Sequence, residues 1–408
     1  MCGTGVQNPG GTGRWGGRGR ALPSPAVRAR PLDGVTVVEL AGIGPVPFAG
    51  MLLADLGADV VRVDRPATVA AADPASPPQD PMARGKRSIG VDLKHPDGVA
   101  TVLRLAAAAD VLIEGLRPGV TERLGVGPEP CHAANPALVY GRMTGWGQEG
   151  PLAAEAGHDI TYLAVAGVLG HIGRAGAPPT PPINLVADFG GGANLLVVGV
   201  LAALFDAGRT GRGTVVDAAM VDGAALLMAP FWAAWASGFW REERGTNLLD
   251  SGAYFYDAYE CADGGHVAVG AIEPQFHAAL LRGLGLDGAA DLPDQMDRDA
   301  WPAMKARLAA IFRTRPRDEW VDVFAGTDAC VAPVLTMGEA ARHPHLGARR
   351  TIVEAGGVPQ PAPAPRVGGA LPLPGPPVVP GQHTDEVLSG LGVSRDEVAR
   401  LRQAGAVA

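Results

Sequence analysis

Two proton-transfer groups stand thirty positions apart near the middle of the chain. His158 lies in the run Gly157-His158-Asp159-Ile160, and Asp188 is followed by Phe189 and three glycines. Each lies beside an expected helix start, where free backbone N–H groups favour negative charge. Such a pair suits a reaction in which one group removes a proton from carbon, the other returns one, and neighbouring amides hold the oxyanion formed in between. The pair therefore predicts inversion of a carbon centre, as in a racemase.

The same residues have structural explanations. A lone histidine in a mostly apolar stretch is usually a hydrogen-bonded core residue. Asp188 could cap a helix that we expect to begin near Gly192, and Asp159 could be the N-cap of a helix over 160–169. Capping and catalysis are compatible, so the residue types alone leave both open.

The composition narrows the class of protein. The 408 residues, 47% of them hydrophobic, exceed the usual size of one domain, so two domains are expected. A net charge of −8 argues against a general nucleic-acid binder, because neutralising phosphates needs a basic surface. The four cysteines show no C-x-x-C spacing, which is typical of reduced thiols. His343 and His345 have no further ligands nearby, so we predict no metal site.

The apolar and basic segments predict neither a signal nor a membrane span. Residues 1–30 contain five arginines, no acid and abundant glycine, and we expect 1–31 to be a disordered extension. The uncharged stretch 223–240 reaches the lower limit for a span, but glycine, proline and serine interrupt it, and the run 193–205 is too short. Both are expected to be buried helices. The last three residues, 406–408, do not resemble the peroxisomal S-K-L address, so the expected location is the cytoplasm.

Strands and helices alternate in the first half of the chain. Such alternation predicts βαβ units and a mostly parallel sheet, which makes the fold α/β. Strands are expected at 35–40, 58–63, 111–113 and 137–140, with helices at 48–56 and 99–109. The turn at 42–47 lacks the third glycine of the dinucleotide fingerprint and no G-x-x-x-x-G-K-[ST] loop occurs, so nicotinamide cofactors and ATP lose support.

The composition of the sequence changes after Asp250. Aromatic residues at 254–259 suggest short strands of a second domain, and the proline-rich segment 358–380 should be an extended connection. Ser394 and Glu397 form a capping box that predicts a final helix. The expected domains are a large domain at 32–220, a linker at 221–257, a small domain at 258–344 and a return segment at 345–408 that completes the large domain.

The motifs of this chain resemble those of the alpha-methylacyl-CoA racemases, a branch of the family III CoA-transferase superfamily, over about 32–401. The matching segments are 38–45, 58–66, 143–148, 157–160, 184–185, 188–189 and 270–276. The resemblance implies a large Rossmann-like domain with a mostly parallel sheet, joined by long linkers to a smaller α+β domain. It also implies a homodimer whose subunits interlock as linked rings.

The resemblance implies a role for each residue of the site. His158 and Asp188 would be the two acid/base groups on opposite faces of the α-carbon of a 2-methyl-branched acyl-CoA. Glu273 would orient the histidine and stabilise its charged form, as carboxylates commonly do for imidazole. The enolate oxygen needs stabilising donors, which we assign to N–H groups at the helix opening, that of Asp159 first. No cofactor is expected, because coenzyme A is part of the substrate.

An acidic protein must gather basic groups locally to hold coenzyme A. The resemblance implies CoA contacts at Arg65, Val91, Asp92, Leu93, Lys94, Gly115, Leu116, Arg117, Pro118, Gly119, Arg123, Gly157, Ile160, Thr161 and Tyr162. Lys94, Arg117 and Arg123 are the candidates for phosphate contacts. Arg84, Lys86 and Arg87 form a nearby basic cluster and are weaker candidates.

Departures from the racemase pattern concern the acyl group. Positions 248, 251 and 254 commonly hold methionine, glycine and proline in the family but are leucine, serine and tyrosine here, so acyl selectivity is expected to differ. Thr161 replaces a common asparagine. One rival function is a CoA-transferase in which Asp159 attacks the thioester and forms a mixed anhydride, although such enzymes typically have a non-basic residue before that aspartate. Another is a non-catalytic acyl-CoA-binding protein, which would not need His158, Asp188 and Glu273.

Overall fold

The fold is built on a parallel sheet, as expected. The computed structural model describes residues 30–73, 79–368 and 373–408, so the predicted extension at 1–31 lies almost entirely outside the described residues. Within these ranges, six strands pair in parallel in the order β3-β2-β1-β4-β5-β6. Their bounds are β1 (Thr36–Leu40), β2 (Asp59–Asp64), β3 (Lys86–Gly90), β4 (Val111–Glu114), β5 (Val139–Thr144) and β6 (Val215–Ala219). The predicted α/β class is therefore confirmed.

Helices cover both faces of this sheet because successive strand residues point to opposite sides. Val37 belongs to the core beneath α1 (Pro45–Asp55) and α7 (Asn194–Thr210). Val38 belongs to the core on the other face, which is closed by α3 (Pro96–Ala108) and α5 (Pro128–Ala134). Two late helices, α15 (Thr384–Gly390) and α16 (Arg395–Gln403), add Val387 and Leu401 to that second core. The end of the chain thus packs on the domain formed by its beginning.

A smaller body follows in the sequence. Its antiparallel sheet has the order β7 (Tyr256–Glu260), β8 (His266–Gly270), β9 (Val331–Pro333), and it packs with α10 (Pro274–Gly283), α11 (Trp301–Phe312) and α12 (Arg317–Phe324). Phe255, Trp301 and Phe312 are fully buried in its own core. Further short elements of the large body are α2 (Pro66–Ala70), η1 (Pro81–Ala83), α4 (Val120–Arg123), α6 (Asp159–Val165) and η2 (Leu169–His171).

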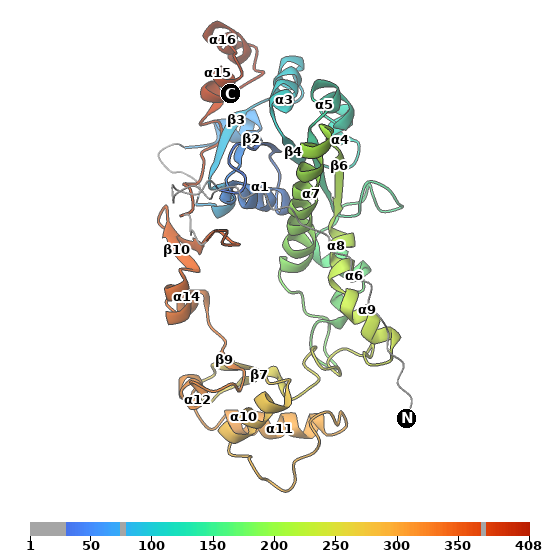
Figure 1. Ribbon diagram of the computed structural model, residues 1–408, viewed down its shortest axis with the longest axis vertical. Coiled ribbons are helices and arrows are strands. Elements are labelled where there is room, and N and C mark those ends of the chain that lie inside the picture. Colours follow the sequence, from blue (N-terminus) through green and yellow to red (C-terminus); the bar gives the residue numbers. More distant parts are fainter. Residues whose placement is uncertain (1–29, 74–78, 369–372) are drawn as a thin grey trace, which may run out of the picture.

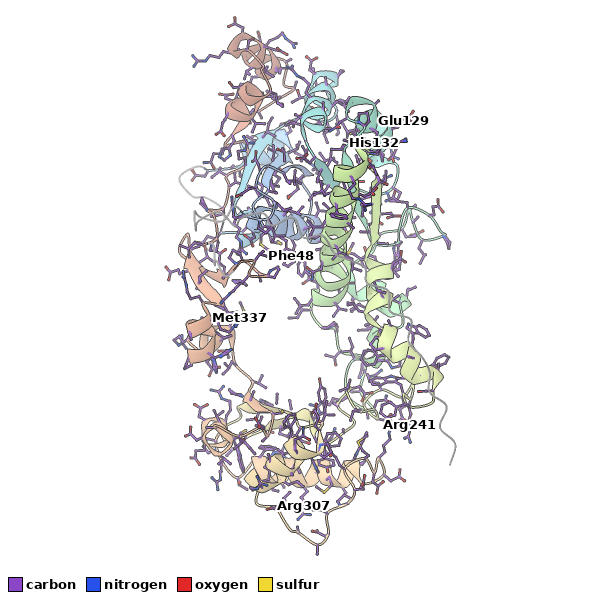
Figure 2. The ribbon with its side chains drawn as sticks, in the orientation of Figure 1. Phe48, Glu129, His132, Arg241, Arg307 and Met337 are labelled. Atoms are coloured by element: carbon purple, nitrogen blue, oxygen red, sulfur yellow. The ribbon has the colours of Figure 1, made fainter. Side chains whose placement is uncertain are left out.

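Two connections join the bodies on opposite sides, so that the chain forms an open ring (Figure 1). The outgoing connection contains α8 (Met220–Leu227) and α9 (Ala229–Ala236). The return connection contains α13 (Met337–Ala340), α14 (Pro344–Arg349), β10 (Ile352–Ala355) and β11 (Val358–Pro361). Figure 2 places Arg241 at the end of the outgoing connection and Met337 on the return connection.

One expectation about these segments is wrong. The stretch 223–240 is not buried within one chain, because α9 has no buried residue and Trp232 and Trp235 are 54% and 48% exposed. The proline-rich segment begins with the extended strand β11, which forms an antiparallel hairpin with β10. The run 193–205 is helical as expected, and the π-helical segment η3 (Leu185–Ala193) continues into α7.

The resulting helix, Leu185–Thr210, has 26 residues and is long and apolar enough to cross a membrane by length and composition alone. Core helices of ordinary globular domains meet the same criterion. Leu196 and Val200 of this helix are fully buried against the sheet. Packing therefore accounts for the face that carries Leu196 and Val200, whereas Leu185, Val198 and Phe205 are 56–70% exposed.

Candidate active site

His158 stands at the start of α6, after the loop that follows β5. It is the N-cap residue, and Asp159 is the first helical residue, so the expectation that Asp159 is the N-cap is wrong by one position. The backbone of His158 is fixed by Thr161, whose Oγ1 accepts from the His158 N–H at 2.9 Å and donates to the His158 carbonyl at 2.7 Å. Thr161 therefore acts as the reciprocal partner of a capping arrangement.

Asp188 stands in the first turn of η3. We expected a helix to begin near Gly192, but it begins seven residues earlier at Leu185, so Asp188 is inside the helix and does not cap it. Single π-helical turns occur frequently at functional sites. The Asn184 Nδ2 donates to the Asp188 Oδ2 at 3.1 Å. Asn184 belongs to one of the matching motifs, but no feature of the residue pattern predicted this contact.

Asp159 connects the two segments. Its Oδ2 accepts the backbone N–H groups of Ala187 and Asp188 at 2.7 and 2.9 Å. The residue is 3% exposed, and its Oδ1 is buried without a hydrogen-bond partner among the described residues. The side chain of Asp159 is thus occupied in holding the turn that carries Asp188.

His158 and Asp188 line the same cavity of about 310 Å³. The turn Ile43–Val46, the segment Gly115–Pro118 and the residues Met143, Trp146 and Tyr162 complete most of its wall. The Tyr162 ring fits closely because a Cβ on Gly145 or Gly157 would lie 2.3–2.4 Å from it. His158 and Asp188 are thus brought together on the wall of one cavity from segments thirty positions apart.

The electrostatics of the cavity favour proton exchange at Asp188. Burial raises the pKa of its carboxyl, and the nearby Asp159 charge raises it further, against the opposing effects of Asn184 and His158. Burial also raises the pKa of the Tyr162 hydroxyl, with Asp188 adding to the shift and Arg117 opposing it. A carboxyl whose pKa is shifted toward neutrality is better suited to both accept and return a proton.

Glu273 does not join these residues within one chain. It is exposed, precedes α10 of the small body, and does not line the cavity that holds His158.

A second cavity of about 560 Å³ collects the expected CoA contacts. Arg65, the segment Val91–Lys94 and Leu116 line it at the carboxyl ends of β2, β3 and β4, and Leu116 lines the catalytic cavity as well. Gly119 has φ of 76° at the start of α4, which favours glycine, and Arg123 ends that helix. Ile160 and Thr161 are exposed on α6 and line neither cavity.

The basic residues expected to contact CoA differ from the weaker candidates in whether they form ion pairs. In the described part of the chain, Arg65, Lys94, Arg117 and Arg123 have no carboxylate within ion-pair distance. The three weaker candidates are all paired. Arg84 is bound to Asp55 at 2.6 Å and Lys86 to Glu39 at 2.6 Å; both cations are buried, so the proposal is wrong for them. Arg87 is bound to Asp59 at the surface and stays a prediction. The first set is free of such pairs and available to bind phosphate.

Comparison with known proteins places the chain in a family. The model of CoA-transferase family III matches residues 32–384. The chain belongs to this family. It is 48% identical to alpha-methylacyl-CoA racemase of Mus musculus and 46% identical to that of Homo sapiens, each over 373 residues, 91% of this chain and 96% of the relative. The crystal structure of a CAIB/BAIF family protein from Brucella suis superposes with a TM-score of 0.75 at 28% identity, over 89% of this chain and 100% of that one. The resemblance inferred from the motifs is confirmed.

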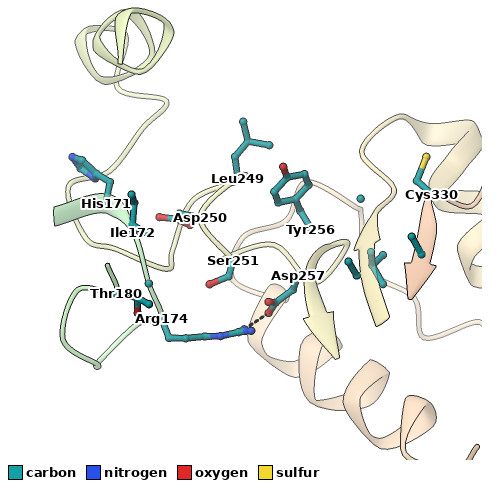
Figure 3. Close-up of a pocket in the computed structure, with 15 residues that line it drawn as sticks. His171, Ile172, Arg174, Thr180, Leu249, Asp250, Ser251, Tyr256, Asp257 and Cys330 are labelled. Carbon is teal, nitrogen blue, oxygen red and sulfur yellow. Dashed lines mark hydrogen bonds and ion pairs between the residues drawn. The ribbon is translucent and has the colours of Figure 1, made fainter. Parts of the chain in front are cut away.

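One departure from the racemase pattern has no place in a substrate pocket. Tyr254 is 1% exposed in the core of the small body, where its hydroxyl is 2.7 Å from the His277 Nε2. Of the other two positions, Leu248 packs against the core of the small body, and Ser251 lines a cavity of about 670 Å³ between residues 171–174 and the sheet of the small body, together with Tyr256 (Figure 3). Of positions 248, 251 and 254 in this family III chain, position 254 therefore cannot set acyl selectivity by direct contact.

Proposed function

We propose that this protein interconverts (R)- and (S)-2-methylacyl-CoA thioesters by transferring protons at the α-carbon. The observation that carries the proposal is that His158 and Asp188 line one cavity. One group takes the α-proton of one enantiomer and leaves a planar enolate, and the other donates a proton to the opposite face. One C–H bond breaks and another forms at the same carbon, so no further reactant is needed. In the reverse direction the two groups exchange roles.

The enolate oxygen is stabilised by the free N–H groups at the start of α6, that of Asp159 first, because the first N–H groups of a helix have no partner within it. A positioned acid or base contributes about 10²–10⁴ in rate, and one oxyanion donor about 10²–10³. The remainder comes from positioning by the CoA moiety, whose binding energy is remote from the reacting carbon. Lys94, Arg117 and Arg123 supply its phosphate contacts, and Arg65 lines the same cavity as Lys94. Coenzyme A is part of the substrate, so the proposed reaction needs no separate cofactor.

The protein acts as a homodimer with interlocked rings in the cytoplasm. Its open ring supports this arrangement, and so does the apolar surface of α8 and α9, where Leu226, Trp232 and Trp235 are 48–60% exposed. Glu273 stands outside the catalytic cavity of its own chain. It therefore orients His158 from the partner chain.

The rival transferase mechanism needs the Asp159 carboxylate to attack a thioester. Its side chain is buried and accepts two backbone N–H groups, which leaves it poorly placed as a nucleophile. The geometry therefore favours racemisation.

A racemisation assay tests the proposal. One enantiomer of a 2-methylacyl-CoA is incubated with the protein in D₂O, and chirality and α-deuterium are followed. We expect racemisation with exchange and without an acyl acceptor, and a loss of about 10²–10⁴ in the variants His158→Ala and Asp188→Ala while CoA still binds. His345→Ala and Asp206→Ala, at exposed positions outside the cavity, serve as matched controls. Wild-type turnover by either site variant, or acyl transfer with stereochemistry retained, would refute the assignment.

A further inference from the structure

The segment Gly115–Arg123 borders both cavities of the proposed CoA site. Gly115, Leu116, Arg117 and Pro118 line the catalytic cavity, and Leu116 and Val120 line the second one. It runs from the end of β4 through a turn into α4 (Figure 1). In the sheet, β4 lies between β1 and β5. Whatever fixes this segment fixes the wall shared by the two cavities.

Glu114 fixes the beginning of the segment. It is the last residue of β4 and is fully buried. Its Oε2 accepts the backbone N–H of Leu116 at 2.6 Å, which closes the turn, and its Oε1 accepts from the Nε of Arg142 at 3.1 Å. Both oxygens of the carboxylate are therefore engaged, one by the loop and one by the neighbouring strand.

Arg142 extends the connection to the end of the segment. It is a residue of β5, and its side chain is only 9% exposed. Besides Glu114, it pairs with Glu122 of α4, with its Nη1 at 2.8 Å from the Glu122 Oε1. The guanidinium thus spans the two ends of the turn and helix that carry Arg117 and Arg123.

We propose that Glu114 is a positioning residue for coenzyme A, because it holds Leu116 directly and α4 through Arg142 in the geometry that receives the ligand. This inference rests on the proposed function, since it takes coenzyme A as the occupant of the two cavities. Glu114 lines neither cavity, so it acts through the segment and does not touch the substrate.

The same contacts make CoA binding depend on pH. Burial raises the pKa of Glu114 to about 7, and the proximity of Glu122 adds to the shift, while the Leu116 N–H and Arg142 oppose it. Tyr140 of β5 also faces this carboxylate, which contributes to the raised pKa of the phenol. Protonation weakens Glu114 as an acceptor and releases the turn. If only the ionised form binds, the apparent Kd rises about tenfold one pH unit below that pKa and is flat well above it.

The test measures the Kd of free coenzyme A by calorimetry across the pH range in the wild type, Glu114→Gln and Glu129→Gln. Glu129 is an exposed residue of α5 (Figure 2), and its variant controls for the titration of the ligand's own phosphate. At alkaline pH we expect Glu114→Gln to raise the Kd and KM about tenfold or more with kcat nearly unchanged, because a hydrogen bond to a charged group is lost. The wild-type change near neutral pH should be absent from Glu114→Gln and retained in Glu129→Gln.

A wild-type Kd with a wild-type pH profile in Glu114→Gln would overturn the inference, as would a loss confined to kcat. If that variant fails to fold, Glu122→Gln decides. Glu122 is 45% exposed, and its variant should weaken CoA binding several-fold while keeping the pH step, whereas an unchanged Kd would count against the network. Failure of the wild type to bind coenzyme A would instead refute the proposed function.

Discussion

Variants of Asp159 distinguish between two roles for its carboxylate: holding the turn that carries Asp188, or attacking the thioester as a nucleophile. Its Oδ2 accepts two backbone N–H groups at 2.7 and 2.9 Å inside the protein. In the variant Asp159→Ala both N–H groups lose their acceptor, and each buried unsatisfied group costs about 1–3 kcal/mol. The free energy of unfolding should fall by about 2–6 kcal/mol. The turn that carries Asp188 would also shift, and a misplacement near 1 Å costs about 10² in rate.

The variant Asp159→Asn separates the two roles. An amide oxygen can still accept the N–H groups of Ala187 and Asp188, so the turn should stay in place. The two hydrogen bonds lose only the extra strength that a charged acceptor gives them. This costs about 1 kcal/mol, which corresponds to less than a tenfold loss in the rate of racemisation. A mixed-anhydride mechanism, in contrast, requires a carboxylate at this position and would not survive the change.

The measurements are denaturant unfolding and α-deuterium exchange on the same samples. We expect Asp159→Ala to be destabilised and slow, and Asp159→Asn to be folded and active. A folded Asp159→Asn without activity would show that the carboxylate itself reacts. An Asp159→Ala as stable as the wild type would show that the two hydrogen bonds do not hold η3.

Two further predictions concern the packing around the site and are measured by denaturant unfolding. Gly191→Ala should destabilise the protein by about 1–3 kcal/mol, because the new Cβ would lie 2.6 Å from the backbone of α8, whereas Gly208→Ala, with nothing within 4 Å, should be neutral or stabilising. Equal effects would refute the packing argument. Lys86→Met should cost about 3–5 kcal/mol by leaving Glu39 buried without its partner, and adding Glu39→Leu should restore most of the loss. A double variant no better than the single one would contradict it.

The strands could be predicted from the sequence because their signals are local, and the motifs that carry His158 and Asp188 were recognised in the same way; the structure places both residues on one cavity. Val37, Val38, Val60 and Val61 form short β-branched runs between turns, and each run is a buried strand. The segment around Asp188 was harder. The helix was expected to begin near Gly192, but it already includes Gly191, where α8 approaches too closely for a side chain. A π-helical turn also does not follow the 3.6-residue pattern used to place helices.

Ion pairs between residues that lie far apart in the sequence could not be predicted. Lys86 and Arg87 looked like phosphate ligands because they are basic and near a family motif. The partner of Lys86 is Glu39, 47 positions away, and the two meet only because β1, β2 and β3 are neighbours in the sheet. The prediction that Tyr254 affects acyl selectivity by direct contact failed for a similar reason. A departure from a family pattern does not show whether the side chain faces a pocket or the core.

Backbone contacts set the positions of His158 and Asp188 relative to each other. A racemase must keep its two proton carriers on opposite faces of the substrate with little freedom, because positioning contributes much of the rate. Here neither carrier depends on a loop alone. His158 is the N-cap of α6, Asp188 is in the first turn of η3, and both segments pack on α8. Asp159 then joins α6 to η3 through two hydrogen bonds. The separation of His158 and Asp188 is thus set by backbone contacts within one body, and under the proposed function CoA binding has only to place the α-carbon between them.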